Sequence, residues 1–140
     1  MRKISKIIIH CTATPEGRDV SVDDIRQWHL DRGWSDIGYH YVIDINGNLK
    51  EGRPLTRAGA HTRGHNKGSI GITYVGGVDE NIKPKDTRTE NQKGRLKALI
   101  LDLMDKYPCA TLHGHNEFSN KACPSFDVQE EYEDIIDFFK

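Results

Sequence analysis

Long apolar runs are absent from this sequence of 140 residues. Stretches such as Ile7-Ile8-Ile9 fall far short of the roughly 20 apolar residues that a membrane-spanning helix needs. The charged start of the chain, residues 1–6, is not followed by an apolar segment of the length found in secretory signal peptides. We therefore expect a protein that is synthesised in the cytoplasm, carries no signal peptide and does not enter a membrane.

Cysteine is scarce and the net charge is small. The three cysteines, Cys11, Cys109 and Cys123, are an odd number, and with no signal peptide this argues against a framework of disulfides. Reduced thiols that are available to a metal fit the composition better. The net charge of −1 provides no excess of positive charge to attract nucleic acid or an anionic membrane surface. We expect neither of them as a partner.

No internal repeat, low-complexity segment or linker divides the chain, and its length suits one domain covering residues 1–140. Apolar patterning predicts strands that alternate with helices, which favours an α/β fold with a mixed central sheet flanked by helices. The expected strands cover residues 6–10, 39–45, 49–51, 69–75 and 110–113, the expected helices cover about 22–32, 90–107 and 128–139, and loops are expected at 12–17 and 78–88.

Local signals mark several of these boundaries. Ser21 and Thr89 stand at N-cap positions, with Asp24 and Gln92 at the matching capping-box positions three residues later. The dipeptide at 46–47, Asn-Gly, is a strong signal for a tight hairpin turn between two of the expected strands.

Two histidines and a cysteine form a candidate zinc site. His10 ends the first expected strand, and Cys123 follows a short segment that contains both His113 and His115. His113 and His115 are two residues apart, so on an extended chain they face the same side, and spacing alone leaves open which of them is a ligand. Two histidines and one thiolate leave one position of a tetrahedral zinc ion open, which is typical of catalytic rather than structural zinc. Such an ion polarises a carbonyl and lowers the pKa of a bound water toward ~7. The competing interpretation is three unrelated residues.

Two further residues have side chains suited to hydrolysis. Lys121, two residues before Cys123, could stabilise a developing oxyanion, and Tyr39 could hold the attacking water or donate to the oxyanion. An exposed loop lysine and a packed tyrosine are the alternatives.

Six segments then carry a resemblance to one family. In order and spacing they resemble the zinc-dependent N-acetylmuramoyl-L-alanine amidases that are related to bacteriophage T7 lysozyme and to peptidoglycan recognition proteins, over residues 7–128. The segments are Ile9-His10-Cys11-Thr12-Ala13-Thr14, Ile25-Arg26-Gln27-Trp28-His29, Gly33-Trp34-Ser35-Asp36-Ile37-Gly38-Tyr39-His40-Tyr41, Ser69-Ile70-Gly71-Ile72, Val75-Gly76-Gly77-Val78-Asp79 and Lys121-Ala122-Cys123-Pro124-Ser125-Phe126-Asp127.

The resemblance implies an enzyme and its residues. It implies the T7 lysozyme and peptidoglycan recognition protein fold, and zinc-dependent hydrolysis of the amide between N-acetylmuramic acid and L-alanine in peptidoglycan. That activity would serve endolysin-like lysis or remodelling of the cell wall, by a monomer that reaches the wall by another route. The implied zinc ligands are His10, His115 rather than His113, and Cys123; the implied catalytic residues are Tyr39 and Lys121; the implied substrate-groove residues are His61, Trp34, Arg63 and Asn66.

Two other functions stay open at this point. Some recognition proteins of this fold bind peptidoglycan without cleaving it, and these typically lack the cysteine ligand or the tyrosine, whereas Cys123 and Tyr39 are both present here. An interaction protein with a structural zinc would need a fourth ligand, for which His113 and Cys11 are the candidates.

Overall fold

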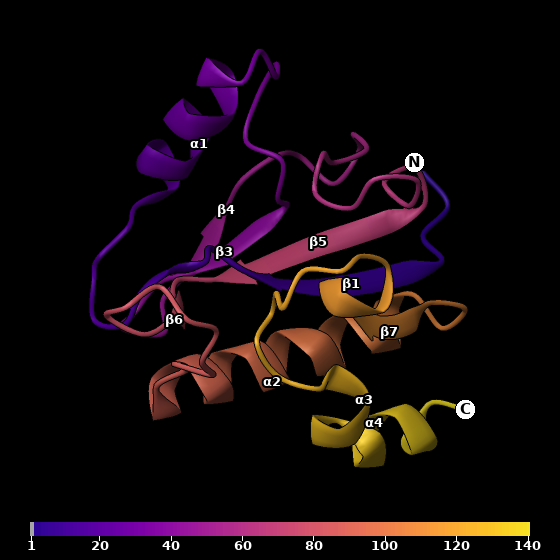
Figure 1. Ribbon diagram of the computed structural model, residues 1–140. Coiled ribbons are helices and arrows are strands. Elements are labelled where there is room, and N and C mark those ends of the chain that lie inside the picture. Colours follow the sequence, from indigo (N-terminus) through magenta and orange to yellow (C-terminus); the bar gives the residue numbers. More distant parts are fainter. Residues whose placement is uncertain (1) are drawn as a thin grey trace.

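A mixed sheet of five strands forms the centre of the computed structural model, which describes residues 2–140 (Figure 1). Its strand order is β4 (Leu49–Glu51), β3 (Tyr41–Ile43), β5 (Ser69–Tyr74), β1 (Lys6–Cys11) and β7 (Thr111–Gly114). β1 pairs in parallel with β5 and β7, β3 pairs in parallel with β5, and β4 pairs antiparallel to β3 through the expected hairpin. The prediction of an α/β fold with a mixed sheet is therefore confirmed.

Helices cover both faces of this sheet. Figure 1 shows α1 on one side and α2, α3 and α4 on the other. Their bounds are α1 Val22–Asp31, α2 Glu90–Lys106, α3 Val128–Glu131 and α4 Glu133–Phe138, and a single 3-10 turn, η1, covers His115–Glu117. The capping boxes predicted at Ser21 and Thr89 are both formed. Along residues 2–140, none of the helices combines the length and the apolarity that crossing a bilayer requires.

Alternation along β1 decides which of its side chains face the core beneath α2. Ile7 and Ile9 belong to that core, together with Ile70 and Ile72 of β5. His10 therefore points to the opposite face of the sheet. Because it is the last residue but one of β1, it also lies at the carboxyl end of the strand. In open α/β sheets this is the end at which ligands bind.

Two segments expected as loops are more ordered than the sequence indicated. Residues 12–17 contain a short strand, β2 (Thr14–Pro15), which pairs in parallel with β6 (Gly77–Val78). Within residues 78–88 the side chains of Thr87 and Arg88 are buried. The Thr87 hydroxyl accepts a hydrogen bond from the N–H of Gly77 at 2.8 Å. In each case the partner is distant in sequence, so local patterning carried no signal for it.

The last helix is broken, whereas a continuous helix was expected over 128–139. It ends at Glu131 and resumes at Glu133, with Tyr132 between the two parts at φ −113° and ψ 24°. The Tyr132 ring is buried in the main core and its hydroxyl accepts a hydrogen bond from Arg88 at 3.0 Å. These tertiary contacts hold the Tyr132 side chain at the point where α3 and α4 meet.

Candidate metal centre and active site

His10, His115 and Cys123 meet at the carboxyl ends of β1 and β7. His10 is held by β1, His115 is the first residue after β7, and Cys123 lies in the loop that leads to α3. One possible ligand atom from each side chain lies within 4.8 Å of the other two, and His10 Nδ1 is 3.7 Å from Cys123 Sγ. The parallel pairing of β1 with β7 is what brings the first residue to the other two.

His113 points away from this cluster. β7 ends at Gly114 and η1 begins at His115, so the alternation of a strand no longer relates the two histidines. His113 Nδ1 is 2.9 Å from a carboxylate oxygen of Glu117, and its Nε2 is 2.7 Å from the Thr111 hydroxyl. The expectation that both histidines face the same side was wrong. Among residues 2–140, neither His113 nor Cys11 joins the cluster as a fourth ligand, which counts against a structural zinc site.

The chemistry of the three side chains fits a zinc ion. Two imidazoles and a thiol form a nitrogen and sulfur donor set that suits this metal. The Nδ1 atom of His115 is buried and has no hydrogen-bond partner among the described residues, so a cation would satisfy it. Burial lowers the pKa of both His10 and His115, so both imidazoles are neutral near pH 7, as ligands must be.

The Cys123 thiol differs from the two histidines in its protonation state. Its sulfur accepts a hydrogen bond from the N–H of Cys11 at 3.1 Å. The contact with the Cys11 side chain, followed by burial, raises the pKa of the Cys123 thiol. The thiol therefore keeps its proton until a cation displaces it, because a coordinating thiol is deprotonated by the metal itself.

A cavity of about 170 Å³ adjoins the cluster. Tyr39 and Lys121 line it beside His115 and Cys123, and the Tyr39 ring centroid lies 5.1 Å from that of His10. The two residues predicted to be catalytic and two of the three predicted ligands, His115 and Cys123, thus line one space, and the third ligand, His10, lies next to them.

One wall of this cavity comes from α1 and was missed by the sequence reasoning. Trp28 and His29 line it from this helix, and Arg32 lines it from the C-cap position. His29 Nδ1 accepts a hydrogen bond from the N–H of Gly38 at 2.8 Å, and its ring centroid is 5.6 Å from that of Tyr39. Their spacing places all three on one helical face. That was the available signal, but it does not distinguish a core face from a cavity wall.

The four predicted groove residues lie elsewhere. Of the described residues that line the cavity, none is His61, Trp34, Arg63 or Asn66. Trp34 packs on the His29 ring with centroids 4.5 Å apart, and Arg63 is exposed on its loop. His61 is buried behind His10, and Asn66 Oδ1 accepts hydrogen bonds from the N–H groups of His61 and Thr62 at 2.9 and 2.8 Å. A role for these residues in a wider groove stays a prediction.

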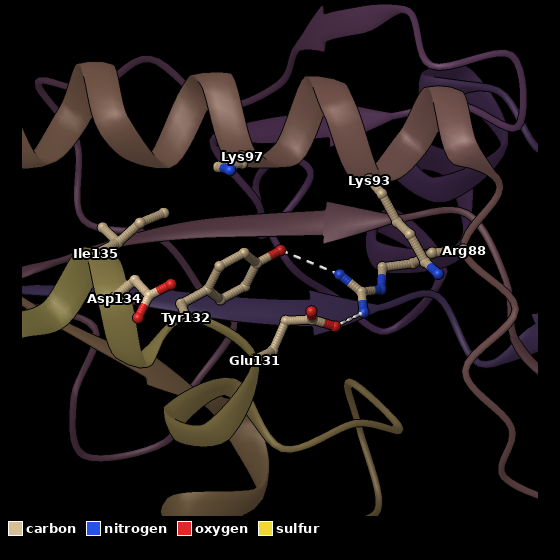
Figure 2. A pocket seen from close by; sticks show the side chains of 7 residues that line it. All are labelled: Arg88, Lys93, Lys97, Glu131, Tyr132, Asp134 and Ile135. Atoms are coloured by element: carbon tan, nitrogen blue, oxygen red, sulfur yellow. Dashed lines mark hydrogen bonds and ion pairs between the residues drawn. The ribbon is translucent and has the colours of Figure 1, made fainter.

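A second cavity, of about 160 Å³, lies between α2 and the C-terminal helices (Figure 2). Its central side chain is Arg88, which pairs with the carboxylates of Asp86 and Glu131 and lies over the Phe126 ring, 3.7 Å from its centroid. Because Arg88 is itself paired with two carboxylates and the Tyr132 hydroxyl, and because His10 is on the opposite face of the sheet, we interpret this cavity as a structural feature.

Comparison with known proteins agrees with this geometry. Residues 1–126 match the family model described as N-acetylmuramoyl-L-alanine amidase. The chain is 42% identical over 127 residues to the endolysin of Escherichia phage T7, covering 91% of this chain and 84% of that protein. It is 31% identical over 137 residues to peptidoglycan-recognition protein SC2 of Drosophila melanogaster, covering 91% and 72%. Among solved structures, the N-acetylmuramoyl-L-alanine amidase LysC of Clostridium intestinale superposes with a TM-score of 0.82 at 29% identity, covering 97% of this chain and 87% of that one.

Proposed function

We propose, from the premise that this chain belongs to the N-acetylmuramoyl-L-alanine amidase family, that it cleaves its substrate with a zinc ion held by His10, His115 and Cys123. The chain is an amidase that hydrolyses the bond between N-acetylmuramic acid and L-alanine in peptidoglycan. The observation that carries the zinc proposal is the meeting of two neutral imidazoles and the half-buried thiol of Cys123 at a cavity that Tyr39 and Lys121 also line.

The protein contributes three ligands and leaves room beside them. When bound, zinc acts as a Lewis acid on the scissile carbonyl and lowers the pKa of water. His10 and His115 supply neutral nitrogen donors because burial lowers the pKa of each. The cavity next to them is where the lactyl carbonyl and the attacking water would lie.

Tyr39 orients the attacking water and the carbonyl. Burial raises the pKa of its phenol, so the hydroxyl keeps its proton at neutral pH. A neutral phenol accepts a hydrogen bond from water and donates one to an oxygen that is gaining negative charge. Its ring packs 5.1 Å from that of His10, which keeps it beside the reacting atoms.

Lys121 stabilises the negative charge of the tetrahedral oxyanion. Lys121 lines the cavity from the loop that also carries Cys123. The positive charge of Lys121 contributes to the lowered pKa of both His10 and His115, after burial, which supports its placement next to the metal centre. The attraction between a cation at this position and the carbonyl oxygen strengthens as that oxygen gains negative charge. Lys121 therefore stabilises the transition state more than the bound substrate.

The wider setting is also proposed. Residues 1–140 form one amidase domain, and the support is that Val128, Tyr132 and Ile135, beyond the matched residues, belong to the main core. The protein works as a monomer on peptidoglycan and takes neither nucleic acid nor membrane as a partner, which its net charge of −1 supports. It is made in the cytoplasm and acts on the cell wall after release by another route, as the phage relatives named endolysin suggest.

Removal of the metal and of one ligand tests the proposal. We expect a chelator to abolish release of L-alanine amino ends from purified peptidoglycan, and added Zn²⁺ to restore it. Cys123→Ser should lose both bound zinc and hydrolysis, because a hydroxyl is a much poorer zinc ligand than a thiolate. Cys109→Ser is the matched control, since Cys109 is exposed and belongs neither to the ligand cluster nor to the lining of the cavity.

Full hydrolysis by the metal-free protein would contradict the zinc mechanism. Binding of peptidoglycan without hydrolysis, in both wild type and Cys123→Ser, would instead indicate a recognition module.

A further inference from the structure

We propose that His61 is a positioning residue that sets the orientation and the tautomer of the zinc ligand His10. This inference rests on the proposed zinc site. His61 lies in the long segment between β4 and β5, and only 9% of its surface is exposed. It does not line the cavity, and its hydrogen-bonding contact with the proposed ligands is with His10.

The two nitrogens of the His10 ring face different groups. His10 Nε2 is 2.9 Å from His61 Nδ1, whereas His10 Nδ1 is 3.7 Å from Cys123 Sγ. Nδ1 is therefore the nitrogen that faces the metal. A ligating nitrogen carries no hydrogen, so the hydrogen of a neutral His10 is on Nε2 and is donated to His61 Nδ1.

The same logic continues one residue further. Since His61 Nδ1 accepts, the hydrogen of a neutral His61 is on Nε2, which is 3.2 Å from the Ser69 hydroxyl. The Thr62 hydroxyl lies 2.9 Å from His61 Nδ1 and 3.2 Å from His10 Nε2, so it is next to the hydrogen bond between the two histidines. The result is a directed chain from the metal-facing nitrogen of His10 through His61 to Ser69.

The ring of His61 has little freedom to move. A Cβ atom added at Gly71 would lie 2.5 Å from the ring, and one added at Gly59 would lie 2.6 Å from it. The ring therefore occupies a slot that two residues without side chains leave open, one of them in β5 next to β1. Asn66 Oδ1 holds the backbone of His61 and Thr62 by two hydrogen bonds.

This arrangement predicts a specific role in metal binding. Groups that accept a hydrogen bond from a metal-ligating histidine fix its tautomer and ring orientation, and their loss typically weakens metal binding by about 10- to 100-fold. His61 and Asn66, which the sequence suggested as groove residues, would thus act from behind the ligand.

A pair of substitutions of similar size tests the role. His61→Asn keeps an acceptor oxygen near the position of Nδ1, while His61→Leu has a similar size and no acceptor. We expect His61→Leu to bind Zn²⁺ about 10- to 100-fold more weakly in competition with a chelator, and His61→Asn to stay close to wild type. Equal Zn²⁺ affinity of wild type and His61→Leu would overturn the proposal.

His40 offers a matched control. It is also buried, and its ring centroid is 5.8 Å from that of His61, but its nitrogens contact the N–H of Gly71 and the carbonyl of Arg57 rather than His10. His40→Gln should keep wild-type Zn²⁺ affinity even where its thermal stability falls. A loss of Zn²⁺ affinity in His40→Gln as large as in His61→Leu would mean that any disturbance of the packing in this region weakens zinc binding. That result would overturn the positioning role.

A spectroscopic measurement on the wild type needs no variant to fold. In the zinc-loaded protein, the ¹⁵N signals of His10 should report a hydrogen on Nε2 and a metal-bound Nδ1. The reverse assignment overturns the proposal. Failure of the zinc site itself has a separate signature, because wild type and His10→Ala would then show the same weak Zn²⁺ binding.

Discussion

At the scale of single residues, the surroundings of Tyr39 determine its chemistry. Its ring lies beside those of His10 and His29, with centroid distances of 5.1 and 5.6 Å. Burial raises its pKa, so it acts as a neutral donor and acceptor rather than as a phenolate. The proposed mechanism therefore asks it to hold oxygen atoms in place and does not ask it to supply a base.

Tyr39→Phe tests that role. We expect kcat on peptidoglycan to fall by about 10²- to 10³-fold, which is the usual loss when one oxyanion donor is removed. Zn²⁺ affinity should stay unchanged, since the phenol is not among the proposed ligands. Tyr107→Phe, on the core beneath α2, is the control and should keep wild-type kcat. An unchanged kcat in Tyr39→Phe would remove this residue from the mechanism.

At the scale of elements, Arg88 connects three segments that the sheet does not hold. It pairs with Glu131 of α3 (Figure 2) and with Asp86 just before α2, and it lies over Phe126 in the loop that carries Cys123. Its side chain is almost fully buried, whereas both carboxylates are partly exposed. The guanidinium therefore joins the approach to α2, the ligand loop and the C-terminal helices at one point.

Arg88→Met should destabilise the fold while leaving the metal ligands in place. Removing one partner of a buried ion pair lowers the free energy of unfolding by about 3 kcal/mol at the lower end of the usual range. The lower end applies here because the two carboxylates are partly exposed and can be solvated by water. For a chain of this length that corresponds to a decrease in Tm of about 10 °C. Thermal unfolding followed by circular dichroism measures it, with Lys97→Met, an exposed position on α2, as the control. Equal Tm values for the two variants would refute the role of Arg88 as a connection.

At the scale of the whole molecule, the C-terminal helices are part of the amidase fold rather than an addition to it. The family model matches residues 1–126, yet Val128, Tyr132 and Ile135 are buried in the same core as β1, β5 and α2. Complete burial of one such side chain contributes about 1.5–3 kcal/mol, so the three together are comparable to the entire stability of a small domain.

A chain shortened to residues 1–126 is thus expected not to fold. It should show no cooperative thermal transition and should bind Zn²⁺ no better than a denatured sample. The reason is that the loop that carries Cys123 would no longer be followed by α3 and α4, which pack on the main core. Removal of Lys140 alone, which is exposed, is the control and should leave the transition unchanged. A cooperative transition in the shortened chain would show that α3 and α4 are dispensable.

What the sequence by itself determined is what depends on near neighbours along the chain. The capping boxes at Ser21 and Thr89 and the hairpin turn at 46–47 were predicted and are formed, because each involves residues two to four positions apart. The order of strands and helices followed from apolar periodicity, which is also local. The residues proposed as ligands and catalytic groups were recognised from the resemblance of whole segments, since spacing alone left His113 and His115 equivalent.

Only the tertiary structure decided the rest. The turn from β7 into η1 separates His115 from His113, the pairing of β2 with β6 orders a segment expected as a loop, and Tyr132 interrupts the last helix where its ring enters the core. The place of His61 behind His10 depends on glycines at 59 and 71 that leave room for its ring. Apart from the turn into η1, each of these features is a contact between residues far apart in the chain, and the packing that selects such contacts exists only once the sheet and its helices have assembled.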